Sequence, residues 1–139
     1  MKIHDATDIA APTISQYAAL YALQDSPDIG QEYRKEYAKL RDLICHRLDE
    51  LDEFFEYHRP MGSYYVFARV KPIVKALSRY ETTVDLSKRI LYEGKVVTIP
   101  GVEFGPTGED HLRFGFPCTE DEINLGFDRL GNFFESLKT

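Results

Sequence analysis

The stretch Tyr92–Phe116 (YEGKVVTIPGVEFGPTGEDHLRFGF) constrains the fold of this chain more than any other part. Gly94 stands where a helix would end, and the β-branched run Val96–Ile99 predicts a short strand. Glycines and prolines between positions 100 and 108 exclude regular structure and predict a shaped loop. A second strand is predicted over His111–Phe116. The segment therefore predicts a helix end, a strand, a loop and another strand.

The predicted second strand has two unlike faces. Side chains alternate along a strand, so Leu112, Phe114 and Phe116 point to one side. Arg113 points to the other side, beside Gly115, which leaves room over the sheet. An isolated arginine on a strand is usually a solvated surface residue. Its planar fork also suits a ligand carboxylate, because it donates two parallel hydrogen bonds and stays charged.

The rest of the chain predicts an α+β fold. Apolar residues that recur every three or four positions mark the helices, and aromatic-rich runs joined by a short turn mark two antiparallel strands. Helices are predicted over residues 11–24, 31–51 and 83–93 and after the capping-box residue Thr119, and strands over residues 54–58 and 63–70. Pro72 and the polar residues 78–82 predict a loop. We expect a three- to four-stranded, mainly antiparallel sheet with helices packed on its apolar face.

Composition excludes several classes of function. The length of 139 residues predicts a single domain, residues 1–139. A formal net charge of -6 argues against nucleic acid as a partner, and the chain has no apolar run long enough for a membrane span. Two cysteines without a disulfide framework, and no signal-peptide pattern, predict a cytoplasmic protein. The four histidines lack metal-ligand spacing, so no metal site is expected.

Five pieces of the sequence, in the right order, resemble the class I/II aminotransferases, fold-type I enzymes that use pyridoxal 5'-phosphate (PLP). The resemblance covers nearly the whole chain, although Ser63 and Tyr64 replace the commoner Ala and Phe. The matching residues are Gln16, Ala18 and Ala19 of "Q.AA..AL"; Tyr37, Arg41 and Asp42 of "Y...R.D"; Pro60, Gly62, Tyr64, Tyr65 and Phe67 of "P.GAFY.F"; Val96, Pro100, Gly101, Phe104, Gly105, Gly108 and Arg113 of "V.V.PG..FG..G...R"; and Arg129 and Leu130 of a final "RL".

The resemblance implies the C-terminal small domain of a larger enzyme that transfers an amino group from an amino acid to a 2-oxo acid. Arg113 would bind the substrate α-carboxylate, and the loop 102–107 would line the cleft. In the family the Schiff-base lysine and the other PLP contacts lie in a large domain upstream, which is absent from this chain. No catalytic or cofactor-binding residue is therefore expected here, and the chain alone should be inactive and bind no PLP covalently.

The resemblance also implies a homodimeric parent enzyme. Its "Q.AA..AL" helix normally packs on the large domain, so this chain should expose apolar side chains there. Tyr64 and Tyr65 point to opposite faces of their strand, so one of them could approach the ligand space beside Arg113, although core packing is expected for both. Two alternatives stay open: a PLP-dependent lyase or synthase of the same fold, and an aminotransferase-like effector or binding domain of a transcription regulator.

Overall fold

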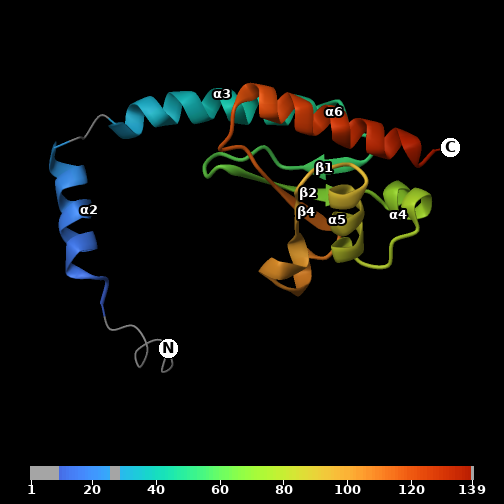
Figure 1. Ribbon diagram of the computed structural model, residues 1–139, viewed down its shortest axis with the longest axis horizontal. Helices are drawn as coiled ribbons and strands as arrows, with labels where there is room; N and C mark the ends of the chain where they lie inside the picture. Colours follow the sequence, from blue (N-terminus) through green and yellow to red (C-terminus); the bar gives the residue numbers. More distant parts are fainter. Residues whose placement is uncertain (1–9, 26–28, 139) are drawn as a thin grey trace. The chain divides into compact units, whose positions relative to one another are not determined.

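The computed structural model of the protein describes residues 10–25 and 29–138. Residues 1–36 and 37–139 form two compact units. The first unit contains α2 (Thr13–Asp25) and the start of α3 (Ile29–Asp49) (Figure 1). No side chain of α2 is buried, and Ile14 and Leu23 are 80% and 78% exposed. The expected exposure of apolar side chains on this helix is confirmed.

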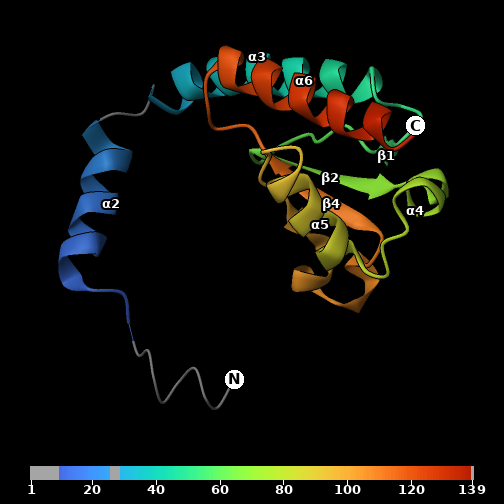
Figure 2. The same cartoon turned by 45° about the vertical axis from the view of Figure 1, so that its right-hand side comes forward.

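The second unit is built on a four-stranded sheet in the order β1-β2-β4-β3. The strands are β1 (Phe55–Tyr57), β2 (Tyr65–Val70), β3 (Ile99–Pro100) and β4 (His111–Gly115), and every neighbouring pair is antiparallel. Figures 1 and 2 show β2 and β4 side by side at the centre of this unit. The predicted α+β fold with a small antiparallel sheet is therefore confirmed.

Helices cover one face of the sheet. Alternate residues of β2 and β4, among them Val66, Leu112 and Phe114, join one buried cluster with residues of α3, α5 (Thr83–Tyr92) and α6 (Glu120–Ser136). Figures 1 and 2 both show α6 running alongside α3. Each large apolar side chain removed from water stabilises the fold by about 1.5–3 kcal/mol. We call this side the covered face.

The last helix begins where the sequence predicted. The Thr119 hydroxyl accepts a hydrogen bond from the Glu122 amide at 3.2 Å, and the Glu122 carboxylate accepts one from the Thr119 amide at 2.8 Å. This capping box satisfies backbone donors that the first helical turn leaves free. Thr82 and Asp85 form the same arrangement at the start of α5.

Two local predictions were wrong. Val96–Thr98 is not part of a strand, because the Thr98 carbonyl accepts a hydrogen bond from the Ser87 hydroxyl of α5 at 2.9 Å, and β3 is only Ile99–Pro100. The stretch after Lys71 is not only a loop. Pro72–Ser78 forms a short helix, α4, since a proline is well tolerated in the first helical turn. Within the described ranges, no helix is both long and apolar enough to cross a membrane.

Candidate functional site

The second face of the sheet carries the candidate binding residue. Its side chains come from Tyr65, Phe67 and Arg69 of β2, Ile99 of β3, and His111 and Arg113 of β4, and we call this side the open face. Strand register places Phe67 and Ile99 directly across from Arg113, one on each side. Cross-strand partners share a face and lie within contact distance. The predicted alternation of β4 is confirmed, since Leu112 and Phe114 are buried and Arg113 is half-buried.

Two aromatic rings flank the Arg113 guanidinium. Its central carbon lies 4.0 Å from the centre of the Tyr65 ring and 4.6 Å from the centre of the Phe104 ring. Both distances are well within the range of a cation–π interaction, which is stronger for a partly desolvated cation. The guanidinium is thus held against apolar surface while it keeps its charge.

Arg113 also lacks an acidic partner among the residues that the structure describes. In contrast, Arg41, Arg47, Arg59 and Arg89 each form an ion pair with an aspartate or glutamate. An unpaired, half-buried guanidinium has N–H donors available for an anion. Its planar fork matches a carboxylate, which accepts two parallel hydrogen bonds.

Core packing of Tyr64 and Tyr65 was predicted, and neither residue is in the core. Tyr64 is 47% exposed, at the end of the sheet. Tyr65 is half-buried on the open face because it lies across from Gly115 in the β2–β4 pairing. A glycine there leaves space for the ring, which extends towards Arg113. The sequence contains an aromatic residue in one strand and a glycine near an arginine in another. Only the strand register shows that the aromatic residue and the glycine lie across from each other.

The glycine-rich loop between β3 and β4, which we call the glycine loop, lies next to Arg113 and folds back so that its two segments touch. It contains two 3₁₀ helices, Gly101–Phe104 and Pro106–Gly108. A Cβ on Gly101 or on Gly108 would overlap the backbone of the other, so the two segments touch through their main chains. Gly105 between them has φ of 128°, a conformation that side-chain-bearing residues rarely adopt. The loop therefore has a fixed shape, and that shape places Phe104 beside Arg113.

Two further contacts anchor the loop. The Phe67 ring stacks on His111 with centres 4.7 Å apart and lies 6.2 Å from Phe104 in an edge-on arrangement. The Glu109 carboxylate accepts hydrogen bonds from the Thr83 amide at 2.9 Å and from its hydroxyl at 2.8 Å, at the start of α5. These bonds hold the pKa of Glu109 below its ordinary value, with the Thr83 amide as the largest cause.

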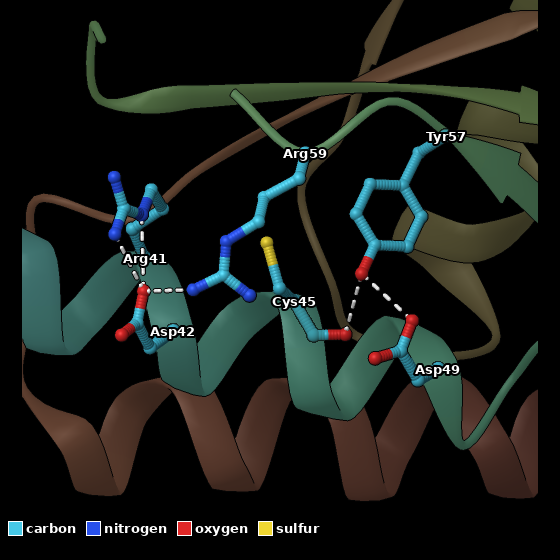
Figure 3. Close-up of polar contacts among 6 residues, drawn as sticks. All are labelled: Arg41, Asp42, Cys45, Asp49, Tyr57 and Arg59. Atoms are coloured by element: carbon cyan, nitrogen blue, oxygen red, sulfur yellow. Dashed lines mark hydrogen bonds and ion pairs between the residues drawn. The ribbon is translucent and has the colours of Figure 1, made fainter. Parts of the chain in front are cut away.

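A second polar cluster, shown in Figure 3, is satisfied internally. Arg41 and Arg59 both donate to one Asp42 oxygen, Arg41 at 2.8 Å and Arg59 at 2.5 Å, and the hydrogen bond from Arg41 is the main reason that the pKa of Asp42 is lowered. The Tyr57 hydroxyl donates to Asp49 at 2.7 Å. These bonds tie the end of β1 and the segment after it to α3. The cluster is a structural brace and differs in this respect from Arg113.

Comparison with known proteins identifies the family of this chain. A profile of the family described as aminotransferase class I and II matches residues 3–130. A probable aspartate aminotransferase of Methanocaldococcus jannaschii is 31% identical over 135 residues, which is 97% of this chain and 33% of that protein. A probable N-acetyl-LL-diaminopimelate aminotransferase of Bacillus subtilis is 32% identical over 96% of this chain and 32% of its own length.

A solved structure of an aromatic aminotransferase from Pyrococcus horikoshii superposes with a TM-score of 0.78. It is 27% identical, and the match covers 99% of this chain and 35% of that one. The chain thus spans about a third of the length of the relatives it matches. With a family profile that covers most of the sequence and a fold shared with a solved relative, the chain belongs to the class I and II aminotransferase family.

Proposed function

We propose that residues 1–139 are the C-terminal small domain of a PLP-dependent aminotransferase, and that Arg113 binds the α-carboxylate of its substrates. The parent enzyme, meaning this chain joined to a large PLP-binding domain, would move an amino group from an amino acid to a 2-oxo acid. The observation that carries the proposal is the unpaired Arg113 guanidinium, flanked by two rings on the open face. Both substrates of such a reaction carry the carboxylate that this group suits.

The chain's own contribution is to bind and orient. When bound, PLP supplies the electron sink that makes bonds to the substrate's α-carbon easier to break. The open face offers two guanidinium groups, those of Arg69 and Arg113, an imidazole and aromatic rings, and none of its residues named above is a lysine. These residues fit a substrate carboxylate, and we expect the large domain to hold the cofactor. Arg113 would fix the substrate in one orientation, so that the bond to be broken is held in the reactive geometry.

The compartment and the assembly of the parent are also proposals. Cys45 is buried and Cys118 is half-buried, and both are free thiols. Free thiols suit a reducing compartment, which supports a cytoplasmic parent. The exposed apolar side chains of α2 suit packing against the large domain. From the family resemblance we further propose a homodimeric parent.

The substitution Arg113→Lys in the parent enzyme tests the proposed site. Lysine keeps the charge but cannot donate two parallel hydrogen bonds. A hydrogen bond to a charged group contributes roughly 1.5–3 kcal/mol, so kcat/KM should fall about ten- to a hundredfold or more, for amino acid and oxo acid alike. Steady-state kinetics on both half-reactions would measure this loss.

Arg69→Lys is the matched control, because Arg69 lies on the open face of β2 but is exposed, and no described aromatic ring lies over its guanidinium as Tyr65 and Phe104 do over that of Arg113. This variant should turn over both substrates normally. If Arg113→Lys also did so, or if it failed to fold, Arg113 would be a structural residue and the assignment would be wrong.

The isolated chain should form no covalent adduct with PLP and should show no transaminase activity. The expectation follows from the absence of a family-type Schiff-base lysine. Incubation of the purified chain with PLP, reduction with borohydride and mass spectrometry would reveal any adduct. A single stoichiometric site on one lysine would contradict this prediction.

A further inference from the structure

We propose that Tyr65 is a positioning residue, whose ring, together with that of Phe104, holds the Arg113 guanidinium in the orientation that receives a carboxylate. The inference rests on the proposed function, since the carboxylate is the one that Arg113 would bind. It adds a second residue, on a different strand, that acts on the substrate only through Arg113.

The Tyr65 ring is fixed by the sheet. Tyr65 lies across from Gly115 in the antiparallel pairing of β2 and β4. An ideal Cβ at position 115 would lie 3.5 Å from the ring carbon Cε1 of Tyr65 and 3.6 Å from Cδ1, so the ring lies over the glycine at van der Waals distance. Two residues earlier on the same strand, Arg113 extends beneath the ring. The contact is therefore built into the strand register.

The Phe104 ring is fixed by the loop. Phe104 ends the first 3₁₀ helix of the glycine loop and is 54% exposed. The edge-on contact with Phe67 and the main-chain contact of Gly101 with Gly108 hold this helix over the sheet. One ring of the pair is thus carried by a central strand and the other by a loop at the sheet surface.

Contact with ring faces restricts the guanidinium without using its hydrogen-bond donors. A cation is attracted to the face of an aromatic ring, whereas the N–H groups of arginine point outwards in its own plane. A long side chain loses conformational entropy when a ligand fixes it, and a side chain that is already held loses less. The rings therefore raise carboxylate affinity even though neither ring touches the carboxylate.

This role depends on the ring and not on the hydroxyl of Tyr65. Tyr65→Phe should keep the contact and Tyr65→Leu should remove it, while both leave the covered face unchanged. The two variants form a matched pair, because each loses the hydroxyl and only one loses the aromatic ring.

The first measurement uses the 139-residue chain itself. Protons above an aromatic ring shift upfield in NMR spectra, so the side-chain Nε–H and Cδ protons of Arg113 should resonate upfield of those of Arg69. The upfield shift should persist in Tyr65→Phe and shrink in Tyr65→Leu. Backbone amide shifts of Val66 and Leu112 serve as the control for an intact sheet. If the wild-type Arg113 protons resonate where those of Arg69 do, the ring contact does not exist and the proposal is overturned.

The second measurement uses the parent enzyme and a double-mutant cycle. Tyr65→Leu should raise KM for the amino acid and the oxo acid by about three- to tenfold, the range expected for loss of one cation–π contact, with a smaller change in kcat. Tyr65→Phe should restore KM. In an Arg113→Lys background Tyr65→Leu should have little further effect, because a positioning residue acts through the arginine.

The outcomes separate the inference from the function on which it rests. A full effect of Tyr65→Leu in the Arg113→Lys background, or no effect in the wild-type background, would overturn the positioning role and leave Arg113 as the carboxylate site. Normal turnover by Arg113→Lys would remove the proposed function and the positioning role with it, even if NMR showed the ring contact.

Discussion

The two faces of the sheet differ in what their residues contact, although the same strands build both. On β4, Leu112 is fully buried among the helices, while its neighbour Arg113 lies half-buried between two rings on the other side. The covered face consists of apolar side chains that pack and have no charge to satisfy. The open face includes a cation with no acidic partner among the described residues. Alternation along one strand thus assigns the apolar core to one face and the proposed binding residue to the other.

The largest difference in unfolding free energy between the two faces should appear when the neighbouring residues Leu112 and Arg113 are each truncated to alanine. Leu112→Ala removes a fully buried side chain from the core, and such changes cost about 2–5 kcal/mol of the free energy of unfolding. Arg113→Ala should cost less, about 0.5–1 kcal/mol, because it removes contacts with two rings but no part of the core. Urea unfolding of both variants of this chain would measure the difference. Similar losses for the two would show that the open face also carries the fold.

A smaller loss of unfolding free energy is expected when a side chain is added between the two touching segments of the loop. Gly108→Ala places a methyl group against the backbone of Gly101, and overpacking of this kind costs about 1–3 kcal/mol. The loop must open, so the Phe104 contact with Arg113 should weaken while the covered face stays intact. Urea unfolding would give the cost, and the NMR shift of the Arg113 side chain would report the contact.

Gly126→Ala is the matched control for that experiment. Gly126 lies within α6, and a Cβ there would meet nothing within 4 Å. Alanine should stabilise the helix by about 0.5–1 kcal/mol, because it favours helical structure more than glycine does. A neutral Gly108→Ala variant with unchanged Arg113 shifts would contradict the described loop closure.

The smallest effect should come from the carboxylate that ties the loop to α5. The pKa of Glu109 is lowered in the folded chain, so its contribution is present above the ordinary glutamate value of 4.5 and is lost as the pH falls through the lowered pKa. Glu109→Gln should therefore cost about 0.3–1 kcal/mol at pH 7, the size of a charge interaction at a helix start. The gap between wild type and variant should close in acid. Urea unfolding at pH 7 and pH 3 would test it, and a gap that persists in acid would exclude this cause.

Periodic patterns made most of the fold predictable. The spacing of Leu40, Ile44 and Leu48 gave the buried stripe of α3, and the Thr119 capping box gave the start of α6, because both depend on residues close in sequence. The alternation of Leu112 and Arg113 gave the two faces of β4. The element after Gly94 was mistaken, since a side chain from α5 bonds the Thr98 carbonyl and competes with strand pairing.

The surroundings of Arg113 were less predictable than its position. Tyr65 and Phe104 come from parts of the chain about 40 residues apart, and neither is adjacent to Arg113 in sequence. Only the strand register shows that Tyr65 lies over Gly115, and only the loop conformation places Phe104. Sequence patterns report which face a residue occupies. Contacts across strands and loops depend on tertiary structure and stay hidden from such patterns.

The alternation of side chains on β4 also determines which pairing of this strand can give a stable molecule. A slip of one residue in the pairing of this central strand would turn Arg113 into the helix-covered core and expose Leu112 and Phe114. An unpaired charge in the core is costly enough to prevent such a molecule from being stable. Only molecules with the correct strand pairing are therefore stable, and in these Arg113 lies on the open face. The pairing that stabilises the fold thus also sets the orientation of the proposed binding group.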